Sequence, residues 1–314
     1  MTNNGIYVYD DIKKKVYPLY KIEWTNIEYL YEIDVKIYDK IKNFKKEDIK
    51  KIEGELKKKK IDKILDTLEN RIKKYYENTK KTLDISNLDL DEIPKYIPND
   101  IKILFCNNNN LTEIDLSKFQ DLEVLDCSNN KIKTFGNILK NKKLIEINCK
   151  FNKLESIESL MTLKNIKILD CSYNLIKDLR KKSETLEILY CSFNKINNLP
   201  YMKNLKKMDC SNNNLYKILN YEKLTELECN NNNIKEINKC ENLLCLFCEN
   251  NKISEINNYK NMDILYCYNN NIKKIEYNAN LEELICDQDI IISKKFNIKT
   301  IKNYKDKYVM LIFN

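Results

Sequence analysis

The sequence predicts an α/β solenoid, in which a short strand from each of many similar repeats pairs with its neighbours in one long parallel sheet. A recurring motif and the even spacing of one cysteine within it carry this prediction. The clearest copy spans residues 122–135 and reads L-x-x-L-x-C-x-x-N-x-I-x-x-F. A unit this short cannot bury its own apolar side, so consecutive units must stack on one another.

The cysteine of the motif recurs at nearly constant intervals. The steps between successive copies are 21, 22, 22 and 20 residues, and then 19 residues five times. With a variant first unit, in which Ile85 takes the cysteine position and Leu88 the asparagine position, this spacing predicts about eleven repeats over residues 81–291. The cysteines are Cys106, Cys127, Cys149, Cys171, Cys191, Cys210, Cys229, Cys248, Cys267 and Cys286.

Within each unit, the alternation Leu-x-Cys places the leucine and the cysteine on the same side of a strand. We expect these side chains to form the inner columns of the core, with adjacent strands about 4.8 Å apart. The leucine column is Leu83, Leu104, Leu125, Ile147, Leu169, Leu189, Met208, Leu227, Leu246, Leu265 and Leu284. The return side of the units adds apolar pairs such as Leu111/Ile114, Ile132/Phe135, Leu154/Ile157, Ile234/Ile237 and Ile272/Ile275.

An asparagine follows each strand where the chain turns across the core. Its amide both donates and accepts hydrogen bonds, so a column of asparagines can satisfy the buried backbone groups of neighbouring turns. We interpret this column as structural; it is Asn109, Asn130, Asn152, Asn174, Asn194, Asn213, Asn232, Asn251 and Asn270. Phe151, Tyr173 and Phe193 precede the asparagine in three successive units and are expected to pack beside the turn.

On these residues, the segment 83–291 resembles the leucine-rich repeat family. The resemblance implies a right-handed solenoid with the parallel sheet on its concave side and a ligand-binding surface there. Units of 19 residues leave little room for α-helices on the convex side, which we expect to be mostly extended or 3₁₀. Short repeats rich in asparagine and cysteine are also similar to those of large DNA viruses and AT-rich protists.

The N-terminal residues 1–80 are predicted to form a separate, mainly helical module. A short hairpin is expected within residues 6–20. Apolar residues at helical spacing predict helices at 26–44 and 60–78, with a shorter helical piece around 49–56 that is interrupted at Gly54.

The C-terminal residues 292–314 no longer follow the motif. Their apolar run Tyr308–Phe313 is suited to pair with the last strand and cover the open edge of the sheet, so we predict an edge-strand cap. A docking peptide for another protein is the alternative.

Composition narrows the classes of function. Lysine and arginine exceed aspartate and glutamate by 55 − 47 = 8, and the chain has no histidine. A catalytic or metal site would therefore need carboxylates, lysine, tyrosine or cysteine. The N-terminus does not have the pattern of a secretory signal, and no apolar run reaches the ~20 residues that cross a bilayer. We expect a cytoplasmic protein whose cysteines stay reduced.

We interpret the cysteines of the motif as protonated packing residues of the core. The one C-x-x-C pair, Cys245 and Cys248, would face opposite sides of a strand and would not easily hold one ion. No catalytic residue, cofactor or metal is predicted. The lysine-rich segment 40–60 makes a nucleic acid a weak second type of partner, because no base-reading motif accompanies it and its lysines also suit a solvated helix face.

The positions left for function are those on the sheet face, namely the two residues that flank the inner leucine and the residue just after the cysteine. An acidic group there consists of Asp126, Asp170, Asp209, Glu226 and Glu228. An apolar group consists of Tyr190, Phe247, Ile264, Tyr266 and Tyr268. Exposed aromatic residues anchor protein interfaces, because each buries a large area at little entropic cost.

We therefore hypothesise a non-enzymatic module whose sheet face binds a protein partner, with the acidic group attracting a basic region of that partner. Aromatic residues are also frequent on strands, so the apolar group could simply line a β surface. A further alternative is an adaptor or substrate-selecting subunit, in which the N-terminal module recruits a second partner or an activity.

Overall fold

The computed structural model describes residues 7–10, 15–18, 46–257, 259–275, 280–287 and 290–292. The expected helix at 26–44 and the expected strand at Tyr308–Phe313 lie outside these residues. The chain divides into two compact units, Met1–Lys73 and Lys74–Asn314.

The first unit contains an antiparallel hairpin, β1 (Tyr7–Asp10) and β2 (Lys15–Pro18), in which Val8 lies opposite Tyr17. Helix α2 (Lys46–Glu77) begins in this unit and ends in the second. The helix continues through Gly54, so the predicted interruption there is wrong. A glycine costs about 1 kcal/mol in a helix, and the lysine, glutamate and leucine residues around it are strong helix formers.

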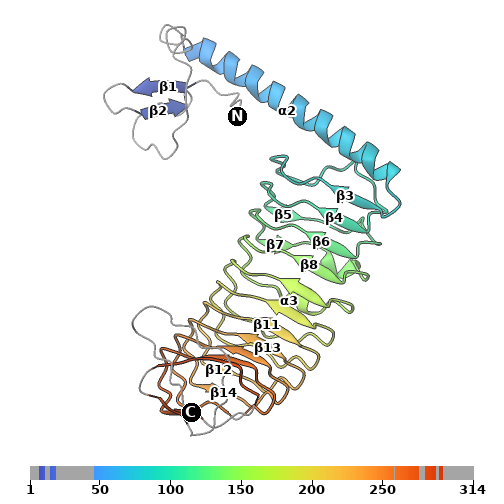
Figure 1. Cartoon of the computed structure of the whole chain (residues 1–314). Helices are drawn as coiled ribbons and strands as arrows, with labels where there is room; N and C mark the ends of the chain where they lie inside the picture. The colour runs from blue at the N-terminus through green and yellow to red at the C-terminus, as the bar shows by residue number, and fades with distance from the viewer. Residues whose placement is uncertain are drawn as a thin grey trace. The chain divides into compact units, whose positions relative to one another are not determined.

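The second unit is a solenoid built on one parallel sheet of eleven strands, each paired with the strand of the neighbouring repeat (Figure 1). The pairing is in register, so that the inner leucines lie opposite one another, as Leu104 does with Leu125. In order, the strands are β3 (Thr82–Asp84), β4 (Ile103–Phe105), β6 (Val124–Asp126), β8 (Glu146–Asn148), β9 (Ile168–Asp170), β10 (Ile188–Tyr190), β11 (Lys207–Asp209), β13 (Glu226–Glu228), β15 (Cys245–Phe247), β16 (Ile264–Tyr266) and β18 (Glu283–Ile285). The α/β solenoid is confirmed.

The return side of the repeats is short and mostly extended, as predicted. Its two-residue strands are β5 (Glu113–Ile114), β7 (Thr134–Phe135), β12 (Lys217–Ile218), β14 (Glu236–Ile237), β17 (Lys274–Ile275) and β19 (Ile291–Ile292). The two 22-residue steps of the motif contain the helical pieces, the 3₁₀ helix η2 (Ile138–Lys140) and the α-helix α3 (Glu158–Met161). The extra residues of these two units therefore make a helical turn.

The inner columns are buried as predicted. Every residue of the leucine column is at most 7% exposed, and every cysteine of the motif at most 5%. The cysteines are free thiols, and burial raises the pKa of Cys106 and Cys171 above its ordinary value, so both stay protonated. Cys248 is buried and Cys245 partly exposed, which confirms that this pair faces opposite sides of its strand.

The asparagine column ties each turn to the one before it. The amide nitrogen of Asn174 donates to the carbonyl oxygens of Cys149 and Cys171 at 3.0 and 3.1 Å, and its amide oxygen accepts from the backbone nitrogen of Leu154 at 2.9 Å. The other eight asparagines bond their own and the preceding unit in the same way. The column satisfies backbone groups that would otherwise be buried without a partner.

The residue before each of these asparagines has a left-handed backbone. Asparagine tolerates this conformation and fills the position in six units, at Asn108, Asn129, Asn212, Asn231, Asn250 and Asn269. Phe151, Tyr173 and Phe193 fill it in the other three, with φ of 53°, 54° and 52°. A bulky residue is uncommon in this conformation, so the three rings are kept there at some cost in backbone strain.

Candidate protein interface

The sheet face is the surface of the eleven-stranded sheet that points away from the core. Within the strands, the middle residue is buried, and the first and third residues reach this face, except for Ile285 of β18, which is buried. All ten residues of the acidic and apolar groups are at least partly exposed. Nine of them lie on strands, and Tyr268 follows the end of β16.

Strand pairing brings part of the apolar group together. Phe247 and Tyr266 lie opposite each other on β15 and β16, with their ring centres 4.9 Å apart in an edge-to-face arrangement. The Tyr266 hydroxyl donates to Glu283 at 2.6 Å, which fixes the ring. Burial and the Glu283 carboxylate together raise the pKa of Tyr266 to about 12. Phe247 and Tyr266 therefore form an aromatic pair whose arrangement is set by contacts within the sheet.

Tyr190 lies apart from this pair. Its direct neighbours across the sheet are Asp170 on β9 and Asp209 on β11. Two strands, β11 and β13, separate it from Phe247. At about 4.8 Å per strand, this is a gap of roughly 14 Å. Tyr190 is thus separate from the aromatic pair of Phe247 and Tyr266.

The acidic group has partners within the sheet. Asp126, Asp170 and Asp209 each accept a hydrogen bond from the backbone nitrogen of the serine two residues on, at 2.9 to 3.0 Å. Glu226 is paired with Lys207 at 2.6 Å. Four of the five acids therefore also have a structural role at the sheet face. Their carboxylates still give this part of the face a negative charge.

Glu228 is the exposed acid that lies between this negative region and the aromatic pair. It is opposite Asp209 on one side and Phe247 on the other. Partial desolvation raises its pKa, and the carboxylates of Asp209 and Glu226 raise it further. A positively charged group of a partner would relieve this repulsion.

The residue just after the cysteine is partly exposed in five of the ten units that carry this cysteine and buried in the other five, so this part of the prediction holds in only half of them. Serine occupies that position in four units and is buried each time, at Ser128, Ser172, Ser192 and Ser211. Glu249 occupies it after Cys248 and is also buried. The strand has ended there, so the exposure of this position varies from unit to unit. Its side chain can still lie on the same side as the third residue of the strand, since the Ser86 hydroxyl donates to Asp84 at 2.6 Å.

Phe151, Tyr173 and Phe193, here called the ring stack, were expected to pack beside the turn. At the turn they stack on one another, with successive ring centres 4.2 Å apart and interplanar angles of 19° and 10°, and they are 42%, 40% and 44% exposed. Their equal offset from the asparagine in consecutive units indicated that they would lie in one column. The sequence did not show that the column is at the surface.

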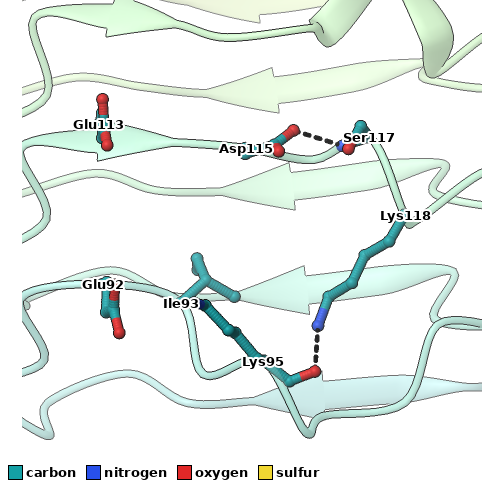
Figure 2. A pocket seen from close by; sticks show the side chains of 7 residues that line it. All are labelled: Glu92, Ile93, Lys95, Glu113, Asp115, Ser117 and Lys118. Carbon is teal, nitrogen blue, oxygen red and sulfur yellow. Dashed lines mark hydrogen bonds between the residues drawn. The ribbon is translucent and has the colours of Figure 1, made fainter.

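A shallow hollow of about 240 Å³ lies on the return side near β5 (Figure 2). The Lys118 ammonium reaches across it to the carbonyl oxygen of Lys95 at 3.0 Å, and Asp115 accepts from the backbone nitrogen of Ser117 at 2.9 Å. These polar groups form hydrogen bonds with the backbone around the hollow, so they stabilise its loops. It contains none of the predicted interface residues.

Within the described ranges, no three cysteine, aspartate or glutamate side chains are grouped so that they could hold a metal ion. Over the same ranges, no helix is both long enough and apolar enough to cross a bilayer.

Comparisons with known proteins agree on the fold. Neither a family model nor a curated protein matches the sequence. Among solved structures, the leucine-rich effector protein YopM from Yersinia pestis is 22% identical, with a TM-score of 0.59 over 70% of this chain and 69% of that one. A leucine-rich repeat protein from Leptospira interrogans is 24% identical, with a TM-score of 0.55 over 62% of this chain and 63% of that one.

The functional domain of InlJ from Listeria monocytogenes, described as including a cysteine ladder, is 24% identical, with a TM-score of 0.54 over 69% of this chain and 55% of that one. This chain spans less than two thirds of the Leptospira and Listeria proteins. The parallel sheet, the buried cysteine column and these likenesses lead to one conclusion: the chain has the fold of leucine-rich repeat proteins.

Proposed function

We propose that this protein is a binding module whose sheet face takes a protein partner, with Phe247 and Tyr266 as its anchors. The observation that carries the proposal is the aromatic pair itself. Two large rings lie on adjacent strands, partly exposed, and a hydrogen bond from Tyr266 to Glu283 holds one of them in place. Rings that are already ordered lose little entropy on binding, which favours them as anchors of an interface.

The charge of the surrounding face supports the same proposal. Asp209, Glu226 and Glu228 lie on the two strands before Phe247, and the lysine between them, Lys207, is already paired with Glu226. A negative region beside an apolar anchor suits a partner with a basic segment next to an apolar one. The N-terminal module remains, as predicted, a candidate for recruiting a second partner.

The test is a double substitution, Phe247→Ala with Tyr266→Ala, in the full-length protein. Photocrosslinking from a probe placed near β15 would identify the bound protein, whose affinity is then measured for each variant. Truncating two anchors should weaken binding by at least tenfold. The matched control is Tyr216→Ala, which removes a 48% exposed ring on the return side.

Thermal unfolding shows whether each variant is folded. Equal affinity for the wild-type and double-substituted proteins, both folded, would exclude the aromatic pair as the anchor. Loss of binding in the Tyr216 control would place the interface on the return side.

A further inference from the structure

Glu249 is unusual for its place in the solenoid. It is 6% exposed, and it is the one charged side chain among the described residues that is buried. Where the same position is buried in other units, serine fills it, as at Ser172, Ser192 and Ser211. A carboxylate is larger than a hydroxyl and loses far more hydration on burial. Packing alone therefore does not account for a glutamate here.

One oxygen of the Glu249 carboxylate, Oε2, is buried and has no hydrogen-bond partner. Buried carboxylates normally have an opposite charge or several donors around them. Lys207, on the same face of the sheet, is already paired with Glu226 at 2.6 Å. Burial raises the pKa of Glu249, and the Glu228 carboxylate adds to this rise. The site is short of positive charge.

The register of the sheet shows what surrounds this carboxylate. Glu228, Phe247 and Tyr266 form one row across β13, β15 and β16. Glu249 follows Cys248, whose backbone nitrogen donates to the carbonyl oxygen of Tyr266 at 2.9 Å. The carbonyl oxygen of Glu249 accepts from the backbone nitrogen of Asn231, three residues beyond Glu228, also at 2.9 Å. The charge of Glu249 also contributes to the raised pKa of Tyr266. Two carboxylates thus lie beside two aromatic rings.

We propose that Glu249 and Glu228 form a socket for one lysine or arginine side chain of the protein partner, with the rings of Phe247 and Tyr266 lying against its alkyl chain and charge. This inference rests on the proposed function. The cation would pair with the exposed Glu228 carboxylate, and its charge would offset the repulsion between Glu228 and the buried Glu249 behind it. Aromatic rings stabilise such a cation through their negatively charged faces, and more strongly once water is displaced.

The proposal is tested with randomised twelve-residue peptides displayed against the full-length protein. Peptides are kept if the Phe247→Ala, Tyr266→Ala double variant no longer binds them, so each uses the sheet face. The socket predicts that these peptides share one lysine or arginine. Replacing that residue by glutamine should weaken binding by at least tenfold, and Glu249→Gln should do the same.

A double-mutant cycle then measures whether the basic residue of the peptide and Glu249 interact. If the basic residue enters the socket, the peptide and protein substitutions together should cost little more than either one alone. The control is Glu236→Gln, which makes the same change on an exposed residue of the return side and should leave affinity unchanged. Because glutamine has the shape of glutamate, Glu249→Gln is expected to fold, and thermal unfolding confirms this for each variant.

The outcomes separate the two proposals. Selected peptides that depend on Phe247 and Tyr266 but contain no common basic residue, or that bind the Glu249→Gln protein equally well, would overturn the socket and leave the proposed function standing. A selection that yields no peptide dependent on the aromatic pair would overturn both.

Discussion

Inside the repeats, one residue type holds the same position from unit to unit, whereas on the sheet face nearly every unit differs from the next. Leucine, cysteine and asparagine recur in the interior because each turn must repeat the same packing and the same backbone hydrogen bonds. The row that contains Glu228, Phe247 and Tyr266 has no such constraint. The interior therefore determines the fold, and the sheet face is where binding specificity can vary.

Replacing Asn174 by alanine should destabilise the protein the most. Its amide bonds the carbonyl oxygens of Cys149 and Cys171 and the backbone nitrogen of Leu154, and these groups would be left buried without partners. We expect a loss on the order of 3 kcal/mol in the free energy of unfolding, measured by denaturant titration. Asn198→Ala, which removes an exposed asparagine, is the control and should cost under about 0.5 kcal/mol. Similar losses in both variants would show that the column is not special.

Replacing Cys171 by serine should destabilise the protein by about 2 kcal/mol, because a hydroxyl is buried where an apolar thiol was. Cys171→Ala keeps the site apolar and leaves only a small cavity, so it should cost less, about 1 kcal/mol. Denaturant titration of the two variants measures the difference. If serine proved as stable as the wild-type cysteine, the cysteine position could not be described as apolar packing.

Replacing Glu249 by glutamine should stabilise the protein, and the effect should depend on pH. Burial raises the folded-state pKa of Glu249 above its unfolded value, so folding favours the protonated acid. The destabilisation is absent below the unfolded pKa, near 4.3, and complete above the folded one. We expect a gain of about 1 kcal/mol at pH 8 and almost none at pH 4. Thermal unfolding at both pH values measures it, and a gain that did not change with pH would contradict burial of the charge.

Replacing Tyr173 by asparagine should have the smallest effect. The substitution removes two stacked contacts, with Phe151 and Phe193, each stabilising by about 1 kcal/mol. It also places the residue type that six other units use into a left-handed backbone, which relieves strain of about 1 kcal/mol. The net loss should be about 1 kcal/mol or less. Tyr173→Ala removes the same contacts without favouring that backbone, so denaturant titration should show a larger loss for it.

The sequence predicted the parts of the fold that repeat. The spacing of the cysteines indicated the solenoid, and the alternation around Leu125 indicated which residues are buried. The sequence did not predict the positions where a residue departs from its usual helix propensity or from the alternation along a strand. The continuous helix through Gly54 reflects strong helix formers on both sides of it. The burial of Ser172 reflects a chain that has already left its strand.

For the candidate site, the sequence predicted only which face of the sheet each residue lies on. Sequence placed Phe247, Tyr266 and Glu228 on one face, and the structure adds that they are neighbours across β13, β15 and β16. The exposure of the ring stack and the burial of Glu249 were not predicted. Position relative to the strand indicates which column a residue joins, but its exposure depends on how each turn bends after the strand ends. Only the three-dimensional structure gives that information.

The column of buried thiols in the solenoid makes local opening of the protein measurable. A protonated, buried thiol reacts with alkylating reagents only when its repeat separates from the neighbouring one. Mass spectrometry of peptides after brief alkylation would therefore show, repeat by repeat, where the protein unfolds locally first. The chain carries one such reporter in nearly every coil, so its local opening can be mapped without adding any label.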